Sequence, residues 1–316
     1  MYNYCTLFDS NYLTRGLAMY ESLKQHSESF HLYIFAFDDR SFKLLNKMKL
    51  EHVTVISLSD FEDEELLKVK DERSAGEYCW TCTPSTIKYC IEKYNLESCT
   101  YLDADLYFFN NPSVLIEEME NNSVLITEHR YTPEYDQSST SGIYCVQFMT
   151  FKNDENGMKV LNWWRDACNE WCFARHEDGK FGDQKYLDDW TTRFEGVHKL
   201  QNLGGGVAPW NVQQYDLTDI NFKLIFYHFH NYKILEDEKI ECGTYKLDKN
   251  DIDILYKLYT KHLENITKDL KSIDTINDYN GIVKKQPFYW KTPLRNLKRY
   301  IKGTYNVFRK KELLGE

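Results

Sequence analysis

The stretch TYLDADLYFFNNP, residues 100–112, decides the fold that this sequence predicts. An apolar run that suits a buried strand ends at Leu102, and two carboxylates, Asp103 and Asp105, follow it at once. An unpaired carboxylate is costly to bury among apolar side chains, so this placement needs a reason. In open α/β sheets, ligands bind beyond the carboxyl ends of the strands. The stretch therefore predicts a ligand site at the end of a strand.

The sequence around this stretch predicts an α/β fold. Over the first 130 residues, apolar strand-like runs alternate with helical patterns, which is typical of a mostly parallel central sheet flanked by helices. We expect strands at Tyr2–Phe8, His31–Phe37, Val53–Leu58, Cys99–Leu102, Ser123–Thr127 and Gly142–Phe151. Thr83 and Pro84 fit the N-cap and first position of a helix that ends near Asn95. Further helices are expected at Ser113–Glu120 and Glu155–Arg175.

Composition bounds the class of protein. With 316 residues, 42% of them hydrophobic, the chain can bury a substantial core, and one large domain with additions fits as well as two. No basic segment followed by an apolar stretch opens the sequence, and no run of about 18 apolar residues occurs, so we expect neither secretion nor a membrane span. The nine scattered cysteines are typical of reduced thiols in a cytosol. Cys79 and Cys82 form a CxxC, but no second pair lies at a zinc-binding spacing, so we interpret them as structural thiols.

Charge is distributed unevenly along the chain. Residues 281–316 hold ten Lys and Arg against two Glu, whereas the other 280 residues hold 29 basic and 47 acidic residues. The acidic body argues against nucleic acid as a partner. From Thr292 onward, Leu294, Leu297 and Ile301 follow helical spacing among basic residues, and Phe288 and Tyr289 precede them. This pattern predicts either peripheral association with an anionic membrane on its cytoplasmic side or packing of the tail onto the acidic body.

The paired carboxylates suit a hard cation. Mg²⁺ and Mn²⁺ prefer oxygen ligands and are often held by one or two carboxylates together with substrate phosphates. The pair therefore predicts a site for a metal-bound diphosphate, against the alternative of a solvated turn. A phosphatase of the haloacid dehalogenase type also carries DxD after a strand, but it does so near the N-terminus, and here Tyr107 stands at its fifth position.

Five segments carry a resemblance to a known family. YLDADLYFF resembles the DxD motif of nucleotide-sugar glycosyltransferases with the GT-A fold, a Rossmann-like nucleotide-diphospho-sugar transferase fold. CTLFDSNYLTRGLAMYESL resembles their first strand and helix. GDQKYL, APWN and FYHF resemble further signatures of bacterial members, near glycosyltransferase family 8, and the five matches follow in order over about the first 230 residues.

The resemblance implies a ligand set for the metal and the donor. Asp103 and Asp105, with Ala104 between them, are expected to bind a divalent metal, Mn²⁺ or Mg²⁺, and the donor diphosphate. His228 is expected as a further metal ligand, and His230, which we expect to face away, is the second choice. Residues expected to bind the nucleotide are Thr6, Phe8, Asp9, Tyr12 and, ranked low, Lys88.

The resemblance also implies residues for catalysis and for sugar binding. Asp183 and Gln184 are expected to open a helix after Gly182, with Asp183 ionised near the reacting carbon. A simple N-cap is the alternative role for Asp183. Residues expected to form a wall against the transferred or accepting sugar are Gly205, Trp210 and Asn211. Two stretches depart from the family pattern, because GIYCVQF carries Cys145 and Gln147 in place of an asparagine and a glycine, and HFHNYK lacks the usual HxxGxxKPW form.

Together these features predict an organisation and a function. We expect a GT-A catalytic domain over residues 1–235, with its nucleotide-sugar half at about 1–112 and its acceptor half at about 113–235, and a helical basic extension over 236–316. The expected reaction moves a sugar from a nucleotide-diphosphate donor, with a UDP-sugar favoured, to a saccharide or lipid-linked acceptor in bacterial surface polysaccharide or lipopolysaccharide synthesis. Kinship with family 8 favours a retaining outcome. The alternatives are a metal-dependent phosphatase, a sugar nucleotidyltransferase and a non-catalytic carbohydrate-binding protein.

Overall fold

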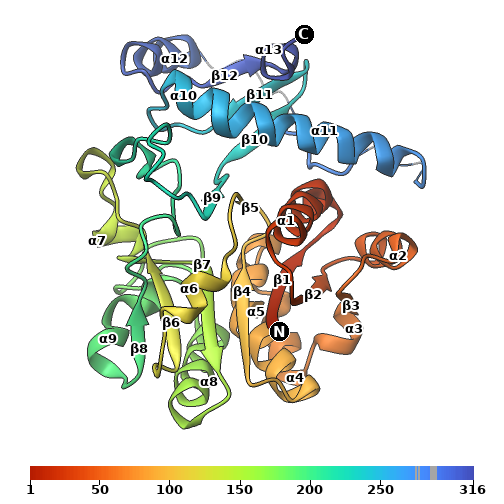
Figure 1. The fold of residues 1–316 in the computed structure, drawn as a ribbon, viewed down its shortest axis with the longest axis vertical. Helices are drawn as coiled ribbons and strands as arrows, with labels where there is room; N and C mark the ends of the chain where they lie inside the picture. The colour runs from red at the N-terminus through yellow and green to blue at the C-terminus, as the bar shows by residue number, and fades with distance from the viewer. Residues whose placement is uncertain (275, 277, 285–289) are drawn as a thin grey trace.

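A computed structural model of the chain describes residues 1–274, 276, 278–284 and 290–316 (Figure 1). Its central sheet has seven strands in the order β3-β2-β1-β4-β7-β6-β8. The strands are β1 (Tyr2–Phe8), β2 (Phe30–Ala36), β3 (Val53–Ser57), β4 (Ser98–Leu102), β6 (Val124–Glu128), β7 (Tyr144–Lys152) and β8 (Val197–Lys199). Neighbouring strands are parallel except at β7, which runs antiparallel to both β4 and β6. The mostly parallel sheet predicted from the sequence is confirmed.

Helices cover both faces of this sheet and bury a core on each. On β1, Tyr4 and Phe8 face one core, whereas Cys5 and Leu7 face the other, as the alternation of side chains along a strand requires. The helices of this part are α1 (Leu13–His26), α2 (Asp39–Met48), α3 (Leu58–Phe61), α4 (Glu64–Lys70), α5 (Ala75–Tyr94), α6 (Ser113–Glu117), α7 (Ser138–Ser141), α8 (Glu155–Glu170) and α9 (Trp190–Arg193). All nine cysteines are free thiols.

The predicted start of the helix before β4 is wrong. The helix α5 begins nine residues before Pro84, at Ala75, because Ser74 and Glu77 form a reciprocal capping box there. Pro84 therefore lies inside the helix, where it cannot donate to the carbonyl four residues earlier. The predicted end is confirmed, since Asn95 takes the left-handed conformation, with φ 49°, that closes many helices.

The chain after the central sheet builds two smaller sheets and then packs against the core that contains Tyr4 and Phe8. The strand β9 (Phe226–His228) pairs antiparallel with β5 (Leu106–Phe108), and β10 (Tyr232–Leu235), β11 (Lys239–Cys242) and β12 (Val307–Arg309) form an antiparallel sheet. The helices here are α10 (Lys249–Asp251), α11 (Lys257–Lys271), α12 (Thr292–Ile301) and α13 (Lys310–Leu314). The extension is thus not only helical, and its α11 lies beside α1 in the same core (Figure 1). The boundary at residue 235 stays a prediction.

Candidate active site

The paired carboxylates stand where the sequence predicts, directly after β4. The backbone N–H of Asp103 donates to the carbonyl of Gln147 on β7, at 3.0 Å, and the carbonyl of Asp105 accepts from Phe229, at 2.9 Å. Pairing of β5 with β9 sets His228 opposite Leu106. Two separate strands therefore deliver the carboxylates and the imidazole to one place.

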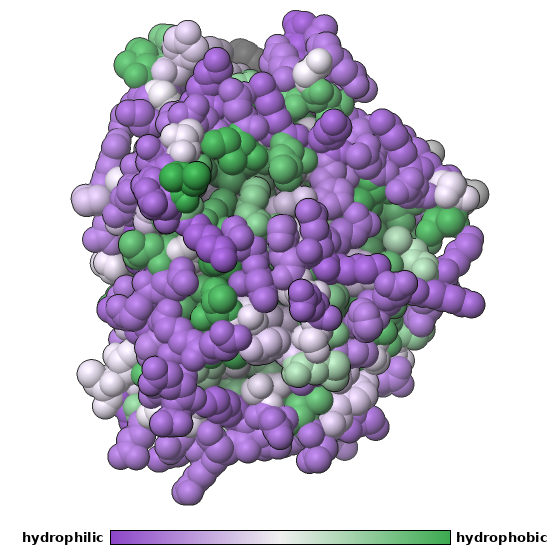
Figure 2. All heavy atoms as spheres, in the orientation of Figure 1, coloured by the Kyte–Doolittle hydropathy of each residue, from purple (hydrophilic) through white to green (hydrophobic). Residues whose placement is uncertain are grey.

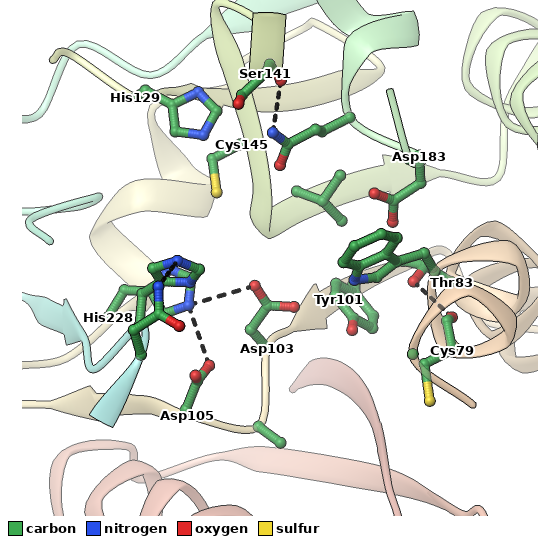
Figure 3. Close-up of a pocket in the computed structure, with 18 of the residues that line it drawn as sticks. Cys79, Thr83, Tyr101, Asp103, Asp105, His129, Ser141, Cys145, Asp183 and His228 are labelled. Atoms are coloured by element: carbon green, nitrogen blue, oxygen red, sulfur yellow. Dashed lines mark hydrogen bonds and ion pairs between the residues drawn. The ribbon is translucent and has the colours of Figure 1, made fainter. Parts of the chain in front are cut away.

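His228 faces both carboxylates (Figure 3). Its Nε2 lies 3.1 Å from Oδ1 of Asp105 and 3.7 Å from Oδ2 of Asp103. One ligand atom from each of the three residues lies within 4.8 Å of the others. Two carboxylates and an imidazole form a donor set that suits Mn²⁺ or Mg²⁺, so the residues fit the predicted cation. Their role as ligands stays a prediction.

His230 does not face away as expected. It lines the same cavity as His228, and both rings contact Trp210, at centroid distances of 5.5 Å for His228 and 5.4 Å for His230. Side chains two residues apart on an extended segment point to the same side, which explains the arrangement. His230 is absent from the cluster of three ligand atoms, so His228 remains the first choice.

Burial and mutual charge shift the pKa values of this cluster. Burial raises the pKa of Asp103 to about 6, and the charge of Asp105 adds to that effect while His228 opposes it. Burial also acts to raise the pKa of Asp105, but the His228 imidazolium outweighs it and lowers that pKa to about 2. Burial acts to lower the pKa of His228, but the two carboxylates raise it well above its ordinary value. The two carboxylates thus favour the protonated form of His228, and a bound cation would replace the proton on Nε2.

Asp183 lines the cavity, where burial opposes the ionised form that the sequence predicts. Burial raises its pKa to about 8, and the charge of Asp103 contributes to the rise. Only a short 3-10 helix, Lys185–Asp189, follows it, and that helix has no side-chain cap, so neither a helix dipole nor an N-cap role applies. Gln184 also lines the cavity, and its Nε2 donates to the carbonyl of Ser141 on α7.

This raised pKa makes stability depend on pH. An aspartate with a pKa of about 8 in the folded chain and about 4 when unfolded stabilises the fold at low pH, and this contribution is lost as pH rises from about 4 to 8. We expect the variant Asp183→Asn to be more stable than the wild type at about pH 9, by as much as about 5 kcal/mol, and to lose that advantage at about pH 4. Urea unfolding at both pH values measures the difference. If the variant and the wild type differ in free energy of unfolding by the same amount at about pH 4 and about pH 9, the assignment of Asp183 as a buried, protonated carboxyl is contradicted.

The site residues surround a cavity of about 670 Å³. Of the predicted residues, those that line it are Phe8, Asp9, Tyr12, Asp103, Ala104, Asp105, Asp183, Gln184, Trp210 and His228. The sequence analysis missed several aromatic and polar members, among them Trp80, His129, Tyr131 and Tyr245. Trp80 lies between the two cysteines of the CxxC, and a helix begun at Ala75 would have placed it one turn before Thr83, which also lines the cavity.

Four predicted residues lie outside the cavity lining. Thr6 is buried on the same face of β1 as Tyr4 and Phe8. The Lys88 ammonium contacts Glu92 and Asn162. Gly205 packs against Leu115 and Leu200. The fourth, Asn211, is fully buried, and its amide donates to the carbonyls of His129 and Gly206. Asn211 therefore fixes the loop that presents Trp210, and its predicted contact with a sugar stays a prediction.

Two uncharacterized proteins of Bacillus subtilis (strain 168) are similar along most of their length: YfnD is 28% identical over 86% of this chain and 91% of its own, and YfnF is 29% identical over 89% and 97%. No protein-family model matches the sequence.

Solved structures resemble the fold at low sequence identity. The glycosyltransferase GlyE of Streptococcus pneumoniae TIGR4 superposes with a TM-score of 0.51 at 12% identity, covering 86% of this chain and 63% of that protein. The bifunctional glycosyltransferase WbbM superposes with a TM-score of 0.53 at 11% identity, covering 84% of this chain and 50% of that protein. This chain therefore spans about half to two thirds of those two structures, and it has the GT-A fold of glycosyltransferases, with a central, mostly parallel sheet flanked by helices.

Proposed function

We propose that the protein is a metal-assisted glycosyltransferase. It would move a sugar from a nucleotide-diphosphate donor, a UDP-sugar, to a saccharide or lipid-linked acceptor in the synthesis of a bacterial surface polysaccharide or lipopolysaccharide. The observation that carries the proposal is the joining of Asp103, Asp105 and His228 beside a large aromatic-lined cavity at the carboxyl end of β4. Ligands bind at this edge of open α/β sheets.

Different residues of the site would have different roles in sugar transfer. Asp103, Asp105 and His228 Nε2 would hold Mn²⁺ or Mg²⁺, which when bound neutralises charge on the donor diphosphate. Trp210 offers a ring to the apolar side of a sugar, and its Nε1 is fixed by the carbonyl of His129 at 2.8 Å. Asp183, protonated at neutral pH, would donate a hydrogen bond to the substrate from its carboxyl group.

The same protonation supports retention at the anomeric carbon. An inverting transferase needs an ionised carboxylate behind that carbon to take the proton of the acceptor. Asp103 and Asp105 belong to the metal cluster, Asp183 holds its proton with a pKa of about 8, and Asp9 accepts from the backbone of Asn11 and Tyr12. These four carboxyl groups all have other roles, so none is assigned as the base of an inverting reaction. We therefore propose that the acceptor attacks from the same face of the sugar that the nucleoside diphosphate leaves.

A turnover assay tests the proposal. The protein would be incubated with UDP-, GDP- and CDP-sugars, with Mn²⁺ or with EDTA, and the released nucleoside diphosphate would be measured. We expect release from one class of donor, UDP-sugars, only when the metal is present. Release at equal rates with EDTA would reject the metal cluster, and the anomeric configuration of the product, read by NMR, would decide between retention and inversion.

We further propose that the basic tail binds the surface of an anionic membrane. No side chain of α12 is buried, and Leu294, Leu297 and Ile301 are 62%, 56% and 76% exposed. Figure 2 shows apolar side chains at the upper left, in the region where α12 lies in Figure 1. Among the described residues, every helix is too short or too polar to cross a bilayer. An exposed amphipathic helix can instead lie in the plane of the membrane.

One basic residue of α12 pairs with the acidic body, and the others do not. Arg299 pairs with Glu241, at 2.8 Å, which fixes the helix to the protein. Arg295, Lys298 and Lys302 have no acidic partner in the part of the chain that the structure describes, so they are available to lipid phosphates. The predicted aromatic residues Phe288 and Tyr289 lie outside the described residues.

Removing two of these charges is expected to weaken membrane binding. Each basic residue near an anionic surface contributes about 1 kcal/mol, so Lys298→Ala/Lys302→Ala is expected to lower affinity roughly thirtyfold for phosphatidylcholine vesicles with about 30% phosphatidylglycerol. Cosedimentation measures the affinity. The control Lys93→Ala/Lys268→Ala removes two exposed lysines elsewhere and should leave binding unchanged. Equal binding to vesicles of pure phosphatidylcholine would instead show that charge plays no part.

A further inference from the structure

Gln147 on β7 contacts both halves of the metal cluster. Its side chain is fully buried, and its Oε1 lies 2.8 Å from Nδ1 of His228. Its backbone carbonyl accepts from the N–H of Asp103, at 3.0 Å. One residue thus connects the strand that carries the histidine with the turn that carries the carboxylates. The sequence marked Gln147 only as a departure from the family pattern.

This contact distinguishes the two nitrogens of the His228 ring. An amide oxygen can only accept, so Nδ1 must carry a proton and donate it to Oε1 of Gln147. The opposite nitrogen, Nε2, then faces Asp105 and Asp103 at 3.1 and 3.7 Å. A histidine binds a metal through an unprotonated nitrogen, and the hydrogen bond made by the other nitrogen decides which one is free.

We propose that Gln147 is a positioning residue that keeps the proton of His228 on Nδ1 and so presents Nε2 to the cation. The inference rests on the proposed metal site and adds to it a residue that contacts the ligand His228 but does not itself line the cavity. The amide oxygen supplies the acceptor that Nδ1 needs without adding a charge of its own.

The NH₂ group of the Gln147 side chain supports this assignment. Its Nε2 is buried and has no hydrogen-bond partner among the described residues. A buried donor without a partner is costly, and a purely packing role would be filled better by an apolar side chain of similar length. The contact between Oε1 and Nδ1 is therefore the feature that the glutamine provides.

The variants Gln147→Met and Gln147→Glu separate positioning from packing. Methionine matches the length of glutamine but offers no oxygen, and it brings no unpartnered donor into the core. Glutamate keeps the acceptor. We expect Gln147→Met to weaken Mn²⁺ binding by about 10- to 100-fold, and Gln147→Glu to restore it to within about threefold. The control Gln201→Met makes the same change at an exposed position and should not alter Mn²⁺ binding.

Two readouts would be collected on the full chain. Calorimetry with Mn²⁺ alone gives the affinity, and NMR of protein with ¹⁵N-labelled histidine, loaded with Mg²⁺, shows whether the Nδ1–H proton of His228 is protected from exchange. The signal is assigned by its absence in His228→Asn. We expect it in the wild type and in Gln147→Glu, and not in Gln147→Met.

The outcomes distinguish this inference from the proposed function. If the wild type does not bind Mn²⁺, the proposed metal site fails and this inference, which depends on it, fails as well. If the wild type binds Mn²⁺ but Gln147→Met binds it equally well and keeps the Nδ1–H signal, the positioning role alone is overturned. Equal weakening in both Gln147 variants assigns the residue to packing and overturns it too.

Discussion

Replacing Asp105 by asparagine is expected to lower metal-dependent turnover by about a thousandfold or more. The reason is the place of Asp105 in the cluster: it is the carboxylate closest to His228 Nε2, and its pKa of about 2 keeps it ionised throughout the physiological range. Asparagine keeps the size of the side chain but removes the charge that would hold the cation. A metal contributes several kcal/mol to the stabilisation of developing charge, and about 4 kcal/mol corresponds to a thousandfold in rate.

The measurement for Asp105→Asn is the initial rate of nucleoside diphosphate release over a range of Mn²⁺ concentrations. The matched control is Asp166→Asn, because Asp166 is 78% exposed on α8. If Asp105→Asn recovers the wild-type rate at any Mn²⁺ concentration, Asp105 contributes only affinity. A wild-type rate in EDTA together with an active variant would remove the metal from the reaction altogether.

Two substitutions of Asp183 are expected to differ strongly from each other. If the protonated carboxyl acts as a hydrogen-bond donor, Asp183→Ala loses that donor and kcat falls about 100- to 1,000-fold, the usual effect of removing one donor to developing charge. Asp183→Asn keeps a donating group, so we expect it to retain activity to within about tenfold. Both variants should bind the metal and the nucleotide much as the wild type does, because Asp183 is not one of the three clustered ligands.

The comparison of the two variants decides the role of Asp183. Steady-state kinetics gives kcat for each, and calorimetry with Mn²⁺ and nucleotide checks that binding persists. A base or nucleophile must be ionised, so asparagine would then inactivate the protein as completely as alanine. Equal losses in Asp183→Asn and Asp183→Ala would therefore reject the donor role, and with it the argument for retention.

Local patterns in the sequence were sufficient for much of the fold. The strands β1 to β4 lie within one residue of their predicted ends because apolar runs between turn signals mark buried strands. The start of α5 was misplaced because Thr83 and Pro84 imitate a helix start, whereas the capping box at Ser74 and Glu77 actually sets it. Pro84 is tolerated inside the helix, which local rules do not anticipate.

Residues of the site were predicted from the sequence only where a local motif marks them. Asp103, Asp105 and His228 were identified by motif, but nothing local indicates that β5 pairs with β9 and brings them together. The pKa of Asp183 is raised by burial among distant segments, so a sequence argument from a helix N-terminus had no means of giving the direction of that shift. Gln147 was missed as a functional residue because its role arises from contact with a histidine 81 positions away.

Calorimetric titration of UDP into the wild-type protein, with Mn²⁺ and then with EDTA, tests the central claim most directly. The claim is that the cluster of Asp103, Asp105 and His228 binds a cation that in turn binds a nucleoside diphosphate. We predict binding with Mn²⁺, no detectable binding with EDTA, and no binding under either condition for the double variant Asp103→Ala/Asp105→Ala. Equal affinity with Mn²⁺ and EDTA, or wild-type affinity in a folded double variant, would contradict the claim.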